Sequence, residues 1–197
     1  MAASPATWKV LGQQVMVGQM TLTLGENGEP HRPFFADPWD GYEHARRRLL
    51  NHITDNGIAD VVVLTGDVHS SFVNDCTIDH QLGYDPATGD GAACVEFVTP
   101  GITSPGLSFD EGTLSLILSR NPHMRWVEVL KKGYLIIDID AERLQGDYFH
   151  FTAAQVGSPD FTGSEYASSW MVETGVPHAV ETAGPAPEIE DAAPLAP

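Results

Sequence analysis

The chain has 197 residues, of which 42% are hydrophobic, and a formal net charge of −17 at pH 7. This length allows one domain with a sizeable core, and no apolar run approaches the roughly 20 residues that cross a bilayer as a helix. A chain so acidic repels nucleic-acid backbones, which excludes nucleic-acid binding driven by charge. It also disfavours anionic substrates, unless bound cations reverse the local sign of the charge.

The N-terminal part predicts an extended segment followed by a loop. Residues 8–24 are rich in Val, Leu and Met, and they favour extended structure. The loop over residues 25–38 contains two glycines and three prolines, which interrupt regular structure. Its end is unusually aromatic, with the sequence FFADPWD at residues 34–40. This run is either a wall of a substrate cleft or a loop held in place by hydrophobic contacts.

The clearest predicted helix covers residues 42–56. Ala45, Leu49 and Ile53 recur at helical spacing, and the pair Asn56-Gly57 is typical of a helix end. The basic triplet at residues 46–48 falls mostly on the outer face of this helix. A solvated helix surface therefore explains the triplet better than a phosphate-binding site does.

The segment VVVLTGDVHSSF, residues 61–72, is the strongest candidate for chemistry. Its first four residues form an apolar run typical of a buried strand, and ligands bind beyond the carboxyl ends of such strands. Gly66 permits a bend, and alternation along an extended chain would bring Asp67 and His69 to the same side. A carboxylate and an imidazole that converge there are suitable ligands for a metal pair in phosphate chemistry. The alternative is that Asp67 caps a turn and His69 is a hydrogen-bonded core histidine.

Short strands dominate the prediction downstream of this segment. A turn-rich excursion over residues 83–91 indicates a surface hairpin. The loop TPGITSPG, residues 99–106, has Pro-Gly pairs that fix two sharp turns. Its hydroxyl side chains either donate hydrogen bonds to a bound oxyanion or cap their own backbone. The predicted strands are residues 70–78, 94–98, 133–140, 144–152 and 166–173, and a short helix is predicted over residues 111–120.

The two cysteines, Cys76 and Cys94, are too few to define a disulfide framework. Their positions leave open whether they pair on neighbouring strands or remain two separately buried thiols. The order of the predicted elements is one strand, a helix, a buried strand and then mostly antiparallel strands. That order indicates part of an α/β sandwich, followed by an acidic Pro- and Ala-rich tail without regular structure over residues 176–197.

Five segments, in order from Trp8 to Phe151, together resemble the alkaline phosphatase D family of metallophosphatases. Any one of them is weak evidence, whereas five in the right order are specific. They are TWKVLGQQVMV at residues 7–17, DPWDGYEHARRRLLNHI at 37–53, VVVLTGDVHSSF at 61–72, VEFVTPGITSPG at 95–106 and NPHMRWVEVLKKGYLIIDI at 121–139.

The resemblance implies a four-layer α/β/β/α metallophosphatase fold that hydrolyses phosphate monoesters and diesters at an iron–calcium site. The resemblance also implies that the full-length enzyme is secreted or periplasmic. The family's GDxH motif supplies catalytic metal ligands, which correspond to Asp67 and His69. Its NPH segment corresponds to Asn121, Pro122 and His123, and we expect Asn121 and His123 to lie near the site without assigning them as ligands.

The resemblance implies that the family's other metal ligands lie in the N-terminal half of the catalytic domain, and we expect that half to lie upstream of this sequence. Cys76 and Cys94 are therefore not equated with the family's metal-binding cysteine. We expect a stub at residues 1–7 and the C-terminal part of the catalytic domain at residues 8–175, with the N-terminal half missing and catalysis incomplete. The alternative is a non-catalytic acidic remnant or binding module that keeps the scaffold.

Overall fold

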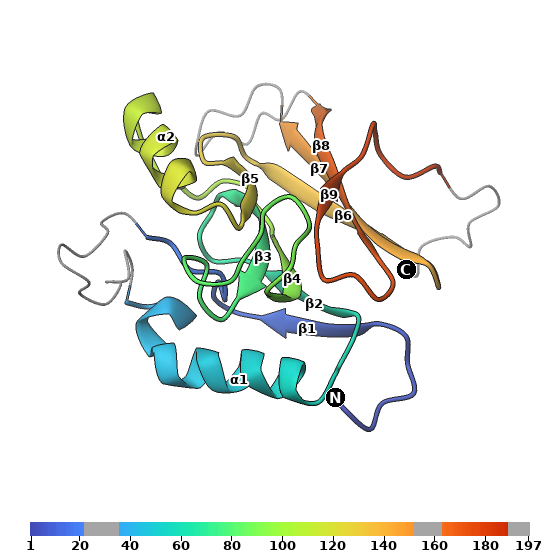
Figure 1. Ribbon diagram of the computed structural model, residues 1–197. Coiled ribbons are helices and arrows are strands. Elements are labelled where there is room, and N and C mark those ends of the chain that lie inside the picture. Colours follow the sequence, from blue (N-terminus) through green and yellow to red (C-terminus); the bar gives the residue numbers. More distant parts are fainter. Residues whose placement is uncertain (22–35, 152–162, 189–197) are drawn as a thin grey trace, which may run out of the picture.

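The computed structural model describes residues 1–21, 36–151 and 163–188. These residues form two sheets, one with the strand order β1-β2-β4-β3-β5 and one with the order β6-β7-β8-β9 (Figure 1). The first sheet comprises β1 (Lys9–Gln13), β2 (Val61–Thr65), β3 (Ser71–Thr77), β4 (Ala92–Val98) and β5 (Met124–Glu128). The second comprises β6 (Gly133–Ile139), β7 (Arg143–Phe151), β8 (Ser164–Glu173) and β9 (Val180–Glu181). The helices are a 3₁₀ turn at Trp39–Tyr42, α1 (Glu43–Asp55) and α2 (Glu111–Arg120).

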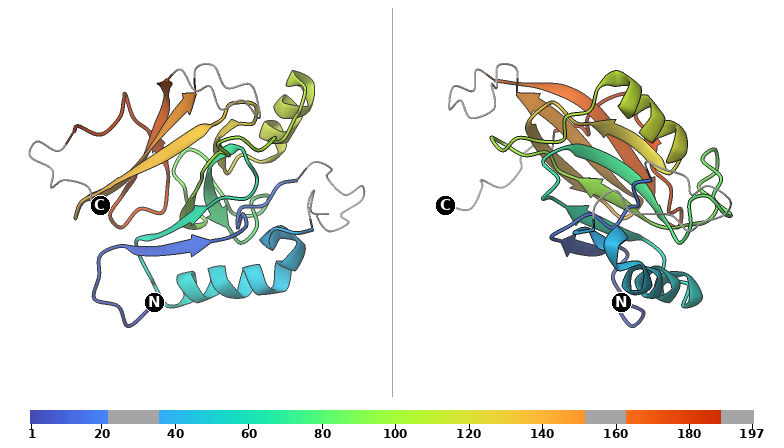
Figure 2. Two further views of the ribbon diagram at one scale, coloured as in Figure 1. Left: turned by 180° about the vertical axis from the view of Figure 1, so that it is seen from behind. Right: turned by 90° about the vertical axis from the view of Figure 1, so that its left-hand side faces the viewer.

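The layers follow from the two faces of the first sheet (Figure 2). Val61 and Val63 point to one face, where they pack with Leu50 and Ile53 of α1. Val62 points to the other face and packs with residues of the second sheet. Strand β2 is therefore buried on both sides, which explains its continuous apolar run. The expected α/β sandwich is confirmed, and the described residues form its α, β and β layers.

The first sheet is mixed, and its parallel part positions the turn after β2. Strand β2 pairs in parallel with β1 and β4, whereas β3 pairs antiparallel with β4 and β5. The turn-rich excursion over residues 83–91 joins β3 to β4, as predicted for a hairpin. Strand β5 was not predicted from the sequence. The short helix over residues 111–120 was predicted with the bounds that α2 has.

The prediction that the basic triplet of α1 lies on the surface is wrong for Arg46. Its side chain is fully buried. Its Nε donates to the Val17 carbonyl at 2.9 Å, Nη1 donates to the Ile78 carbonyl at 3.3 Å, and Nη2 donates to the Thr77 carbonyl. Arg47, by contrast, forms a partly exposed ion pair with Glu43, one helical turn away. Arg46 thus joins α1 to the strand ends instead of facing solvent.

The C-terminal part is more ordered than the sequence indicated. Residues 176–188 belong to the predicted disordered tail, yet they pack on the domain, and Val180 pairs with Met171 of β8. Ala179 is fully buried, and its backbone N–H donates to Asp75 at 2.9 Å. The expectation is therefore corrected for these residues, because side-chain carboxylates bind the backbone of a Pro- and Ala-rich segment. The rest of the tail, residues 189–197, and most of the predicted loop at 25–38 lie outside the described residues.

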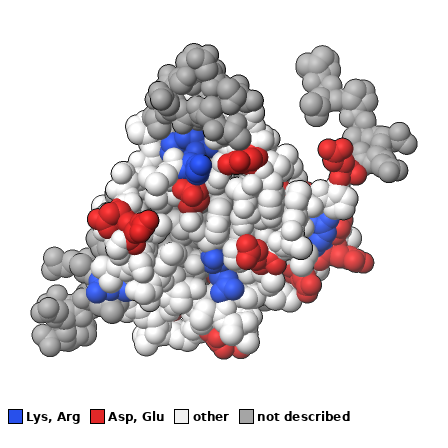
Figure 3. Space-filling model, turned by 90° about the horizontal axis from the view of Figure 1, so that it is seen from above, with Lys and Arg blue, Asp and Glu red and all other residues white. Residues whose placement is uncertain are grey.

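The surface agrees with the charge of the sequence. Figure 3 shows Asp and Glu side chains spread over one face of the molecule, with isolated Lys and Arg between them and no continuous basic patch on that face. Within the described ranges, no helix is long and apolar enough to cross a membrane.

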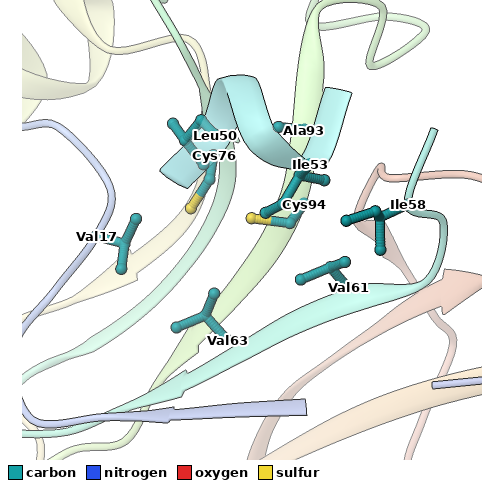
Figure 4. Packing of buried hydrophobic residues seen from close by; sticks show 9 residues of the cluster. All are labelled: Val17, Leu50, Ile53, Ile58, Val61, Val63, Cys76, Ala93 and Cys94. Atoms are coloured by element: carbon teal, nitrogen blue, oxygen red, sulfur yellow. The ribbon is translucent and has the colours of Figure 1, made fainter. Parts of the chain in front are cut away.

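Cys76 and Cys94 are two free, fully buried thiols that face each other across the β3–β4 pair. Their sulfur atoms lie side by side under α1 (Figure 4). A hydrogen bond from Cys94 and burial raise the pKa of the Cys76 thiol well above its usual value, so the folded protein disfavours the reactive thiolate. A disulfide must therefore form before the sheet closes, and directly opposed residues of an antiparallel pair are spaced to allow one.

We expect refolding in oxidised glutathione to join Cys76 and Cys94. Each thiol loses a hydrogen, and the glutathione disulfide is reduced to two thiols. The bond closes a short loop and is worth about 3 kcal/mol of chain entropy, which raises Tm by several degrees. Mass spectrometry of the intact chain, lower by two hydrogen atoms, and thermal unfolding check this result. A Cys94→Ala variant treated in the same way should show neither change, and a wild-type chain that keeps both thiols would contradict the prediction.

Candidate functional site

The turn that follows β2 brings Asp67 and His69 into one cavity at the carboxyl end of the strand. The cavity has a volume of about 250 Å³. The sequence predicted this convergence from alternation along an extended chain, but the physical reason is different. Both residues adopt left-handed backbone conformations, with φ of 72° for Asp67 and 59° for His69. The cavity is lined by Asp37, Pro38, Asp67, Val68, His69, Pro105, Gly106 and Leu107.

The left-handed turn is costly for residues with side chains. A residue held in a sparsely populated backbone region costs about 1–3 kcal/mol, and such residues cluster at functional sites. The Val68 N–H donates to the Gly66 carbonyl at 2.9 Å, which closes the turn tightly. Asp67 and His69 both have this conformation and are separated by Val68; Asp and His are among the non-glycine residues that adopt it most often, and contacts from other segments hold it here.

The ring of His69 is oriented by the loop that follows β4. Its Nδ1 lies 2.8 Å from the backbone carbonyl oxygen of Pro105. A carbonyl oxygen only accepts hydrogen bonds, so Nδ1 carries the proton and Nε2 keeps its lone pair. This is the arrangement in which metal-binding histidines are found, with one ring nitrogen on a backbone carbonyl and the other on the metal. The ring is thus hydrogen-bonded through Nδ1, and Nε2 is left for another partner.

The backbone of the turn is held from beneath by buried polar side chains. Lys132 donates from Nζ to the His69 carbonyl oxygen at 2.7 Å. Ser70 Oγ donates to the Val129 carbonyl at 3.3 Å and accepts from the Leu107 N–H at 3.2 Å. Burial lowers the pKa of the Lys132 ammonium, and the nearby Glu128 carboxylate partly opposes that effect.

The loop at residues 99–106 contacts the cavity in a way that the sequence did not predict. Its hydroxyl side chains were candidates for binding an oxyanion. In the structure, the part of this loop that lines the cavity is Pro105-Gly106, followed by Leu107. The loop thus shapes the cavity and fixes the His69 ring through its backbone.

Asp37 is a further acidic residue in the same cavity. It belongs to the run FFADPWD, of which residues 36–40 are described, and Asp37 and Pro38 of that run line the cavity. The Trp39 backbone N–H donates to the Met16 carbonyl at 3.1 Å, and the Trp39 indole N–H donates to Gln13 at 3.1 Å. These contacts hold Asp37 beside the end of β1. The sequence signal that could have identified Asp37 was its position directly before a proline, Pro38, at the end of a loop.

Glu96 of β4 is a fully buried carboxylate that joins the strand ends beneath the site. Its Oε1 accepts from the Val17 N–H and from the Thr65 hydroxyl, each at 2.7 Å. Its Oε2 accepts from the Gly18 N–H at 2.9 Å and from the Asn74 amide at 3.0 Å. Thr65 is the last residue of β2, so Glu96 fixes the point from which the functional turn begins. Sequence reasoning missed this role, because Glu96 is one acid in an apolar strand.

Asn121 and His123 lie in a different buried polar cluster. Asn121 donates to the Thr21 and Ile117 carbonyls at 2.8 and 2.7 Å, and its Oδ1 accepts from the Thr21 N–H at 2.8 Å. His123 Nε2 donates to the Gln19 carbonyl at 2.9 Å, and its ring lies against that of His80 with centroids 4.4 Å apart and planes tilted by 39°. Neither residue is among those that line the cavity. Their contacts hold the segment after β1, and their proximity to the site stays a prediction.

The donors of the cavity do not form a complete metal site by themselves. In the part of the chain that the structure describes, no group of three or more His, Cys, Asp or Glu side chains could hold a metal ion.

The two-sheet α/β sandwich agrees with the comparisons with known proteins. The family model described as PhoD-like phosphatase matches residues 1–148. The chain therefore belongs to the PhoD-like phosphatase family. This assignment confirms the family that the five sequence segments indicated.

Two individual proteins are similar to this chain. Alkaline phosphatase D of Bacillus subtilis (strain 168) is 30% identical over 190 residues, which are 89% of this chain and 31% of that protein. The solved structure described as "Structure of PhoD" superimposes with a TM-score of 0.75 at 27% identity, covering 94% of this chain and 33% of that one. The chain thus spans about a third of the length of the relatives it matches.

Proposed function

We propose that this chain contributes to the metal-dependent hydrolysis of phosphate monoesters and diesters, with Asp67 and His69 as metal ligands. One observation carries the proposal. The Pro105 carbonyl oxygen holds the His69 ring through Nδ1, so Nε2 is available, and Asp67 lines the same cavity as His69. Membership of a phosphatase family supports the reaction class, and the family resemblance suggests iron and calcium as the metals.

Each residue has a distinct role in the proposed chemistry. The Asp67 carboxylate supplies negative oxygen donors, which hard cations prefer, and His69 supplies a neutral nitrogen donor. Metals held by these two side chains would supply positive charge that neutralises a phosphate group and would make water more acidic. They would also reverse the repulsion between an acidic protein and an anionic substrate. Lys132 and Pro105 hold the turn and the ring in place for this task.

A pair of metals needs more ligands than these two residues supply. Because the described residues contain no three-ligand group, we propose that the remaining ligands come from outside them. We further propose that residues 8–175 are the C-terminal part of a metallophosphatase domain, and that the chain is incomplete for catalysis. The family resemblance favours a secreted or periplasmic location.

The proposal is tested by comparing the wild-type chain with an Asp67→Asn/His69→Gln variant. We expect calcium and iron to bind the wild type weakly, and the variant to lose at least 10-fold in affinity by calorimetry, because both donors are altered. Hydrolysis of an aryl phosphate with both metals added should remain close to background in both proteins. An Asp55→Asn/His44→Gln variant is the matched control, since both residues are exposed on α1.

The outcomes separate the parts of the proposal. Equal metal affinity in the wild type and the site variant would show that Asp67 and His69 are not ligands, and would favour a non-catalytic acidic binding module. Robust turnover that His69→Gln abolishes would support the ligands, but it would overturn the incompleteness of the chain.

A further inference from the structure

Lys132, which directly precedes β6, is an unusual residue for its position. Only 3% of its surface is exposed, whereas lysine is almost never buried without a partner. Among the described residues it forms no ion pair. The partner that these residues supply is the backbone carbonyl oxygen of His69, 2.7 Å from Nζ. A buried ammonium that has a carbonyl as its partner is costly to keep, so the contact needs an explanation.

The surroundings of the ammonium connect it to the cavity wall. A Cβ atom at Gly106 would overlap both Lys132 Nζ and the His69 carbonyl oxygen. Gly106 is therefore the residue that allows the loop after β4 to lie directly on the Lys132–His69 contact. Because Gly106 also lines the cavity, the ammonium lies immediately behind the wall on which the proposed ligands are arranged.

His69 is thus fixed at two points that the rest of the chain supplies. Its backbone adopts a left-handed conformation, with φ of 59°, in which the Lys132 ammonium captures its carbonyl group. Its ring is held separately through Nδ1 by the Pro105 carbonyl. If the backbone of His69 relaxed to an ordinary conformation, the ring would leave the Pro105 carbonyl, and the direction of Nε2 would be lost.

We infer that Lys132 is a positioning residue of the site: its ammonium holds the His69 backbone so that Nε2 stays the ring nitrogen available to a ligand. This inference rests on the proposed function for the importance of Nε2. The contact itself acts on the metal-free chain, so it can be tested apart from metal binding.

The first test reads the His69 ring directly. Nitrogen-15 NMR of the full metal-free chain distinguishes a ring protonated at Nδ1 from a mixture of the two neutral forms. We expect the wild type to show the Nδ1-protonated form and Lys132→Met to show a mixture. Lys131→Met is the matched control, because Lys131 is the exposed neighbour, and it should match the wild type. A His69 ring in Lys132→Met that is indistinguishable from the wild type would overturn the inference.

A second measurement separates positioning from simple support of the fold. Lys132→Met removes a buried charge that is costly to keep and also the hydrogen bond to the His69 carbonyl; because these two effects have opposite signs, Tm should change little while the ring changes. With Mn²⁺ as the probe, Lys132→Met should bind the metal at least 10-fold more weakly than the wild type does. A loss of this size is typical when a group that orients a metal ligand is removed. If the Mn²⁺ affinity of Lys132→Met falls together with a large fall in Tm, Lys132 supports the fold as a whole, and this result would count against a positioning role.

A second variant and the metal-free spectra cover two further cases, in which Lys132→Met does not fold or the wild type binds no Mn²⁺. Should Lys132→Met fail to fold, Gly106→Ala displaces the same ammonium while keeping the lysine, and the same change in the His69 ring is expected. A wild-type chain that binds no Mn²⁺ would contradict the proposed function. The ring spectra of the variants would still decide the role of Lys132, because they need no metal.

Discussion

Glu96→Leu is expected to lower the free energy of unfolding by about 4 kcal/mol or more. The substitution removes the acceptor for four buried donors, from Val17, Gly18, Thr65 and Asn74. A buried donor left without a partner costs about 1–3 kcal/mol, and hydrogen bonds to a charged acceptor lie at the upper end of that range. Urea denaturation followed by circular dichroism measures the change. The effect should be large because Glu96 is fully buried.

Glu96→Gln provides the graded comparison. Glutamine keeps one acceptor oxygen but places an NH₂ group against donors, and we expect it to cost about 2 kcal/mol. Glu173→Gln, on the exposed end of β8, should change the free energy of unfolding by less than about 0.5 kcal/mol. If Glu96→Leu were as stable as Glu173→Gln, the carboxylate would not be the link between the strand ends.

The carboxylate also connects stability to the site. Thr65 and the functional turn are consecutive in the chain, and Glu96 accepts the Thr65 hydroxyl at 2.7 Å. The same carboxylate holds the Val17–Gly18 backbone after β1. Two segments that are distant in sequence are thereby fixed beside the cavity by one group. Sites need such support, because a ligand that is only approximately placed loses most of its affinity.

The elements with a strong local pattern were predictable from the sequence. Strand β2 and helix α2 have an apolar run and clear end signals, and α2 begins at a capping residue, Asp110, that accepts from the Thr113 N–H at 2.7 Å. The convergence of Asp67 and His69 was also predicted, although through extended backbone. The positive φ of Asp67 and His69 could not be predicted, because Pro105 and Lys132, which hold the turn, are distant in the sequence.

Buried polar contacts were the main failure of sequence reasoning. Glu96, Arg46 and Lys132 look like surface residues, because nothing near them in sequence shows their partners. Asp75 is a similar case: it is fully buried on β3, and its partners His178 and Ala179 follow about 100 residues later. The same contacts order residues 176–188, whose composition predicted disorder. Partners that the fold supplies from a distance are invisible to patterns of local composition.

Arg46→Met is expected to lower the free energy of unfolding by about 3 kcal/mol. The guanidinium of Arg46 is fully buried and donates to the carbonyls of Val17, Thr77 and Ile78. Methionine fills much of the volume but leaves these acceptors without a donor, at a cost of about 1–3 kcal/mol for the group, and it removes the link between α1 and the first sheet. Urea denaturation measures the change.

Arg48→Met is the matched control, because Arg48 belongs to the same triplet and is exposed; it should change the free energy of unfolding by less than about 0.5 kcal/mol.

Arg46 and Glu96 hold the same residue, since Arg46 binds the Val17 carbonyl and Glu96 binds the Val17 N–H. Once either contact is lost, the segment after β1 is already loosened. The Arg46→Met/Glu96→Gln double variant should therefore lose less stability than the sum of the single variants, by about 0.5 kcal/mol or more. Strict additivity would show that the two buried charges stabilise the segment independently.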